Sequence, residues 1–144
     1  MMFKTAITLL LLSIVMLSAG TASAAVKIVV HGSNSVSSIT KAKAADLFLK
    51  RVTRWDNGRA VTPVDLSDKN PTRGAFSKEL LGKEVAWVKS YWQKMIFSGR
   101  ATPPVELSTD TEVLEFVRNN ADAVGYVSEG ATLPGGVRAV SVSE

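Results

Sequence analysis

The stretch Leu66-Ser67-Asp68-Lys69-Asn70-Pro71-Thr72-Arg73-Gly74-Ala75-Phe76 joins an alternating apolar segment to the start of a helix. Asn70 is a preferred N-cap residue and Pro71 a preferred first helical residue, so a helix is predicted to begin there. Residues 59–66 before it predict a strand with Val64 and Leu66 on one face. Ligands of α/β domains commonly bind where such a strand meets such a helix.

Two interpretations of this helix start follow from the local sequence. The free backbone N–H groups of the first turn, near Thr72 and Arg73, favour an anion-binding site. The alternative is that Asn70 and Pro71 only cap the helix and bind nothing.

The rest of the chain continues the alternation of strands and helices. Strands are predicted over residues 26–30, 59–66, 123–127 and 137–142, with helices over 40–50, from 71 to Gly82, from Val85 to Gly99, and from the capping box at 109–112. Four strands interleaved with four helices predict an α/β domain with a mostly parallel or mixed sheet covered by helices. Two finer predictions are a type I′ turn at Asn57-Gly58 and, from the broad apolar stripe that Trp87 and Tyr91 widen, a substantially buried third helix.

The N-terminal residues resemble a secretory signal peptide. Lys4 precedes an apolar run over residues 6–17, and Ala22-Ser23-Ala24 forms a small-x-small cleavage site. The run is short for a membrane span, and no second candidate follows, so no stable membrane anchor is expected. We therefore predict a signal peptide over 1–24 and one exported, periplasmic domain over 25–144, which is 120 of the 144 residues.

Composition narrows the possible chemistry. The chain has no cysteine and one histidine, so neither a disulfide framework nor a usual zinc or copper site is expected. Neither a nucleophile–base pair nor a working pair of carboxylates is visible, and His31 at a strand end is more typical of a structural residue, so we predict a non-enzyme with no cofactor.

The basic residues give the exported domain only a mild positive charge. Without Lys4, 16 of the 17 basic residues stand against 13 acidic ones, a formal +3. Several of them concentrate in residues 41–59, which is compatible with a solvated helix face or an anionic partner. The export signal and the lack of interleaved aromatic residues argue against nucleic acid.

Two segments carry a resemblance to a known family. Residues 45–56, ADLFLKRVTRWD, resemble the signature D-[IL]-[FY]-L-G-K-[IV]-T-x-W-x-D, with Lys50 in place of the usual glycine. Residues 123–127, AVGYV, resemble the strand G-A-I-G-Y-V. Both belong to the phosphate-binding proteins of periplasmic ABC transporters, and the chain is most similar to short secreted relatives with a single such domain. The resemblance implies one lobe of a type II periplasmic-binding-protein-like fold.

The resemblance also implies candidate ligand residues. Counted from Phe76, which matches the family phenylalanine, Asp68 matches the family aspartate and Thr72 the threonine. Leu66 stands where the family has arginine, and Asn70 and Pro71 replace serine and glycine. Arg73 is the nearest guanidinium that could replace the missing one. The predicted oxyanion site is therefore Asp68, Asn70, Thr72 and Arg73.

Two functions remain open from the sequence. The first is an exported substrate-binding-like protein that binds phosphate or a related oxyanion for an ABC transporter or a sensor. The second is a periplasmic protein–protein interaction module that has lost ligand binding, with a transporter, sensor or envelope protein as partner. A homodimer or a partner subunit would supply the second surface that a single lobe lacks.

Overall fold

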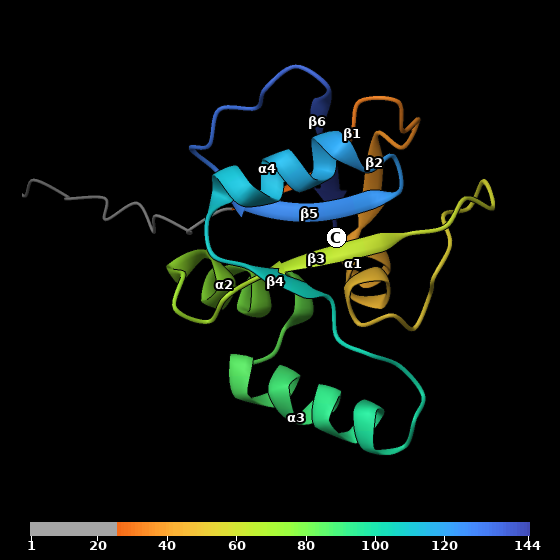
Figure 1. Ribbon diagram of the computed structural model, residues 1–144, viewed down its shortest axis with the longest axis vertical. Coiled ribbons are helices and arrows are strands. Elements are labelled where there is room, and N and C mark those ends of the chain that lie inside the picture. Colours follow the sequence, from red (N-terminus) through yellow and green to blue (C-terminus); the bar gives the residue numbers. More distant parts are fainter. Residues whose placement is uncertain (1–25) are drawn as a thin grey trace, which may run out of the picture.

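The computed structural model describes residues 26–144 (Figure 1). The predicted signal peptide, with its cleavage site after Ala24, lies outside the described residues. The described elements, in chain order, are β1 (Val26–His31), β2 (Ser38–Thr40), α1 (Lys41–Phe48), β3 (Thr62–Leu66), α2 (Pro71–Phe76), the π-helical turn η1 (Ser77–Leu81), α3 (Val85–Phe97), β4 (Val105–Leu107), α4 (Asp110–Asn119), β5 (Ala123–Ser128) and β6 (Val137–Ser143).

The strands form one mixed sheet in the order β2-β6-β1-β5-β3-β4. Strand β1 is antiparallel to both of its neighbours, β5 and β6. Strand β3 runs parallel to β4 and β5, and β2 runs parallel to β6. The predicted class, an α/β domain with a mixed sheet, is confirmed.

The number of strands was predicted wrongly. The described residues contain six strands, and the prediction of four missed β2 and β4. Each is three residues long and lies at one edge of the sheet. So short a strand has no periodicity of its own and depends on its neighbour for hydrogen bonds. The predicted strand over 59–66 begins only at Thr62.

Helices cover both faces of the sheet (Figure 1). Helix α4 packs on one face, while α1 and α2 pack on the other. Gly125 on β5 allows α4 to approach closely, because a Cβ there would lie 2.7 Å from Cγ1 of Val113. On the opposite face, the Tyr126 ring stacks on Phe76 at 3.7 Å between centroids, and Phe48 packs edge-on against both rings. The core therefore consists of two layers separated by a sheet that is buried at its centre.

Helix α3 is less buried than its sequence predicts. Its buried residues are Val88 and Trp92, which pack against Leu49, whereas Phe97 is 96% exposed. The helix lies away from the sheet (Figure 1) and is held to α1 partly by the Tyr91 hydroxyl, which donates to the Leu49 carbonyl at 2.7 Å. A broad apolar stripe indicates which face of a helix can be buried. Whether that face is buried depends on how the other helices and strands pack against it.

The Asn57-Gly58 turn also differs from the prediction. Gly58 has φ +86°, but Asn57 does not share the positive φ that a type I′ turn needs at both central positions. The Gly58 N–H donates to the Trp55 carbonyl at 2.8 Å, and the Trp55 N–H donates to the Arg59 carbonyl at 2.8 Å. The turn is therefore a three-residue loop that closes on a left-handed glycine.

Candidate functional site

The predicted site lies where parallel strands end. Strands β5, β3 and β4 run side by side in the same direction, so the loops after them meet at one edge of the sheet. The loop after β3 carries Asp68 and Asn70, and α2 begins at Pro71 with Thr72 in its first turn. This edge is the expected ligand position in an α/β domain.

The helix start forms as the sequence predicts, but the backbone N–H groups of its first turn already donate to Asn70. The Asn70 side chain caps α2 by accepting from the Thr72 N–H at 3.0 Å. The Arg73 N–H donates to the Asn70 carbonyl at 3.0 Å. Pro71 has no N–H. The three first-turn positions therefore present no unused backbone donor to an anion.

Arg73 points into the body of the protein. Its side chain is 2% exposed, and Nη1 lies 2.9 Å from Oδ2 of Asp65. The same nitrogen donates to the Leu66 carbonyl at 2.8 Å, and Glu106 on β4 lies 3.4 Å away. In this arrangement Arg73 holds a buried carboxylate and is not presented to the loop.

Asp65 has partners on every side. Its Oδ1 accepts hydrogen bonds from the Tyr126 hydroxyl and, at 2.9 Å, from the Leu66 N–H. Burial raises the pKa of Asp65 above its ordinary value, while Arg73 opposes that shift. Burial likewise raises the pKa of Tyr126, which keeps its hydroxyl protonated as a donor. We call Asp65, Arg73 and Tyr126 the buried triad.

Asp68 faces solvent and pairs with α3. Lys89 forms an ion pair with its carboxylate, and the hydrogen bond from Lys89 lowers the pKa of Asp68 below its ordinary value. The Asn70 amide donates to the Ser108 carbonyl at 3.2 Å, which ties the loop to the end of β4. Of the four predicted residues, Asp68, Asn70 and Thr72 therefore lie together at the loop, while Arg73 is directed away from it.

The start of α4 at the same edge carries negative charge. The Thr109 hydroxyl accepts from the Glu112 N–H at 3.2 Å, as the capping box predicts. The Glu112 carboxylate accepts from the Ser108 N–H at 2.8 Å, one residue before the cap. Asp110, also in the first turn, accepts from the Ser128 N–H at 3.2 Å and from the Ser128 hydroxyl at 2.6 Å, so carboxylates of the chain itself already occupy this helix start.

The basic residues of 41–59 are mostly engaged with the protein itself. Their charged groups contact acidic side chains or a carbonyl in the pairs Lys41–Glu144, Lys43–Asp56, Arg51–Asp46, Arg59–Asp122 and Arg54–Gly58 carbonyl. Between residues 26 and 144 the structure places no group of three acidic, histidine or cysteine side chains that could hold a metal ion. Over the same residues no helix combines the length and apolar character needed to cross a membrane.

Sequence reasoning missed Asp65 and Tyr126. The available signal was a carboxylate within an otherwise apolar strand, since buried charges are normally paired. Its partner was not identifiable, because Tyr126 lies 61 residues further along the chain.

The chain resembles known proteins in its structure and not in its sequence. Neither a protein-family model nor a curated protein sequence matches the chain. Solved structures do match. An ABC-type phosphate transport receptor from Vibrio cholerae aligns with a TM-score of 0.64 and 19% identity. The chain therefore has a periplasmic-binding-protein-like fold. The similarity that residues 45–56 and 123–127 suggested is confirmed at the level of the fold.

Two further structures agree. A putative phosphate ABC transporter substrate-binding protein from Clostridium perfringens, solved with bound phosphate, aligns with a TM-score of 0.63 and 21% identity. PstS from Borrelia burgdorferi aligns with a TM-score of 0.64 and 14% identity. The matches cover 81–83% of this chain but only 44–47% of those proteins, so the chain spans less than half of each.

Proposed function

We propose that this chain is an exported, non-enzymatic, substrate-binding-like lobe that acts through a protein partner and does not hold phosphate tightly by itself. The observation that carries the proposal is Arg73. Its guanidinium is buried against Asp65 and so is not available to an oxyanion at the loop.

The state of the neighbouring donors supports the same conclusion. The first-turn N–H groups of Thr72 and Arg73 already have acceptors in Asn70. An exposed contact to a charged ligand is worth less than about 1 kcal/mol, so the remaining side chains are too few for tight binding. The partner that we propose for such a lobe is a transporter, sensor or envelope protein in the periplasm, because the structural neighbours are phosphate transport proteins.

Titration calorimetry tests the proposal. Phosphate is titrated into the protein expressed from the full chain, with sulfate as a control ligand. No saturable heat is expected up to millimolar phosphate. A light-scattering mass measured on the same sample reports whether a second copy completes the lobe. Saturable phosphate binding that Thr72→Ala abolishes and the exposed-loop control Thr102→Ala preserves would overturn the proposal.

Oxyanion binding is the second candidate function, and one observation favours it. Asp68 is exposed and ionised beside Lys89, and its loop also contains Asn70 and leads into Thr72. A carboxylate of this kind accepts a hydrogen bond from the P–OH group of phosphate, a donor that sulfate lacks at neutral pH. Under this candidate, Asp68→Asn reduces the preference for phosphate over sulfate. Variants of Arg73 are unsuitable here, since their loss of stability would obscure any loss of binding.

A further inference from the structure

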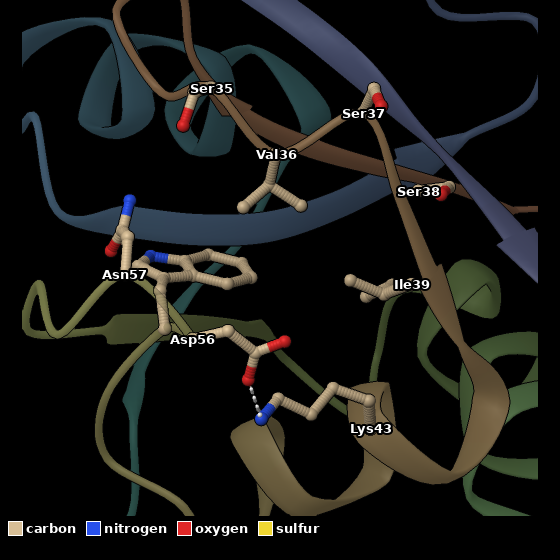
Figure 2. A pocket seen from close by; sticks show the side chains of 9 residues that line it. Ser35, Val36, Ser37, Ser38, Ile39, Lys43, Asp56 and Asn57 are labelled. Carbon is tan, nitrogen blue, oxygen red and sulfur yellow. Dashed lines mark hydrogen bonds and ion pairs between the residues drawn. The ribbon is translucent and has the colours of Figure 1, made fainter.

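A groove lies beside the edge strand β2, far from the β3–α2 loop. Two adjoining cavities of about 300 and 330 Å³ share Ser38, Ile39, Lys43 and Asp56. Figure 2 shows the segment from Ser35 to Ile39 along one wall, with Asp56 and Asn57 facing it. The groove therefore follows the outer side of the sheet. We call it the β2 groove.

The backbone of β2 faces this groove with unused hydrogen-bonding groups. Strand β2 is an outermost strand, and its single neighbour β6 runs parallel to it. The Ser141 N–H donates to the Ser37 carbonyl at 2.9 Å. Because backbone groups alternate in direction along a strand, Ile39 then bonds to β6, whereas the N–H and C=O of Ser38 point outward. An outward donor and acceptor on an edge strand form a template for another strand.

The groove also contains a buried donor without an acceptor. Trp55 lines it and is 4% exposed, and its indole N–H has no partner among residues 26–144. Val36 and Ile39 supply apolar surface beside it. Two other buried side-chain atoms, Arg73 Nε and Asp110 Oδ1, also have no partner among residues 26–144, so the indole N–H marks a polar position in the wall and does not by itself identify a ligand.

Charge in the groove is available for exchange. Lys43 rises from α1 and pairs with Asp56 at 2.8 Å, as the dashed line in Figure 2 marks. The Asp56 side chain is 92% exposed while that of Lys43 is 28% exposed, so the carboxylate is the more solvated member of the pair. An incoming carboxylate can replace Asp56 on Lys43 at little cost, because an exposed pair contributes less than about 1 kcal/mol.

We propose that the β2 groove binds an extended segment of a partner polypeptide, which adds to the sheet beside β2 and places an acidic group on Lys43. The inference rests on the proposed function and specifies its partner as an extended, acidic peptide. Main-chain hydrogen bonds to Ser38 supply affinity, while Lys43 and the apolar wall supply selectivity. A compact small molecule fits less well, since it would leave the outward groups of Ser38 unused.

Peptide selection on the folded protein provides the test. A display library of random twelve-residue peptides is panned on the protein expressed from the full chain, and enriched peptides are titrated by fluorescence anisotropy. Ser38→Pro removes the outward N–H without removing a bond to β6, and proline is tolerated at such an edge. Thermal unfolding confirms that this variant folds. Backbone N-methylation of the peptide tests the same bonds with the protein unchanged.

The expected result is enrichment of acidic, β-branched peptides whose affinity falls tenfold or more with Ser38→Pro and with N-methylation. Lys43→Gln should weaken binding several-fold, whereas the matched exposed-lysine control Lys69→Gln should not. Failure to enrich any peptide, or equal affinity for the proline variant, would overturn the inference. A doubled light-scattering mass that Ser38→Pro abolishes would also overturn it, by showing that a second copy occupies the groove. The phosphate titration is independent of these results, so the inference and the proposed function can fail separately.

Discussion

The buried triad and the β2 groove use polar groups in opposite ways. In the triad, the Asp65 carboxylate meets a guanidinium, a hydroxyl and a backbone N–H, all within the chain. In the groove, the outward backbone groups of Ser38 have no partner in β6, and the Asp56 carboxylate that pairs with Lys43 is 92% exposed. Charged groups paired inside the protein hold the fold together, whereas the free backbone N–H and C=O of an edge strand can pair with another strand. The resemblance points to the β3–α2 loop, whereas the binding surface that we propose lies along the β2 edge of the sheet.

The strongest test of the triad as a structural element is Arg73→Met. Removing the guanidinium leaves Asp65 buried without its counter-charge, so the free energy of unfolding should fall by about 3–5 kcal/mol, measured by urea denaturation. The double variant Asp65→Asn with Arg73→Met should recover most of that loss, because it removes the unpaired charge as well. An Arg73→Met protein with unchanged stability would mean that Arg73 is free to serve a ligand, and the contrast between the two regions would collapse.

Gly125 tests how tightly α4 packs on β5, the strand that carries Tyr126 of the triad. In Gly125→Ala the new Cβ would lie 2.7 Å from Cγ1 of Val113, so β5 and α4 must separate. Overpacking of this kind typically costs about 1–3 kcal/mol, measurable by thermal or urea unfolding. Gly130→Ala is the matched control, since nothing lies within 4 Å of a Cβ there. A comparable loss in both variants would assign the effect to glycine replacement in general.

The pH dependence of stability separates the buried carboxylate from the exposed one. Burial raises the pKa of Asp65 above its ordinary 3.8, so the folded state binds a proton at Asp65 more tightly than the unfolded state does. The resulting contribution to the free energy of unfolding is present at low pH and declines as pH rises through the raised pKa. Lys89 lowers the pKa of Asp68. The contribution of Asp68 to the free energy of unfolding is therefore present above pH 3.8 and declines as pH falls through the lowered pKa. The stability difference between wild type and Asp65→Asn should therefore decrease with rising pH, and that for Asp68→Asn should increase.

Urea unfolding from pH 2 to pH 7 measures both differences. Glu106 also lies near Arg73, and its negative charge adds to the raised pKa of Asp65, so the Asp65 comparison is made in a Glu106→Gln background. Two curves with the same slope would show that both carboxylates are equally solvated, contrary to the burial of Asp65.

Features that depend on a few neighbouring residues were predictable from the sequence. The caps at Asn70 and Thr109 and the left-handed Gly82 are as expected, because each is determined within one turn of helix. The direction of Arg73 was not predictable. It depends on Asp65 in a neighbouring strand and, through Asp65, on Tyr126 far along the chain. The exposure of α3 has the same cause, since periodicity does not report which helices lack a cover.

Lys50 offers the smallest and most local test, in the segment that carries the resemblance. It is the sole non-glycine residue between 26 and 144 with positive φ, at +53°, where the signature has glycine. A left-handed backbone costs an L-residue about 1–2 kcal/mol, of which the greater freedom of unfolded glycine offsets about 0.5–1 kcal/mol. Lys50→Gly should therefore raise the free energy of unfolding by roughly 0.5–1 kcal/mol, while Lys50→Ala should leave it almost unchanged. Gly82→Ala, at φ +63°, should lower it by a similar amount. Equal effects of the glycine and alanine variants at position 50 would mean that the lysine side chain, and not its backbone, determines the stability of this turn.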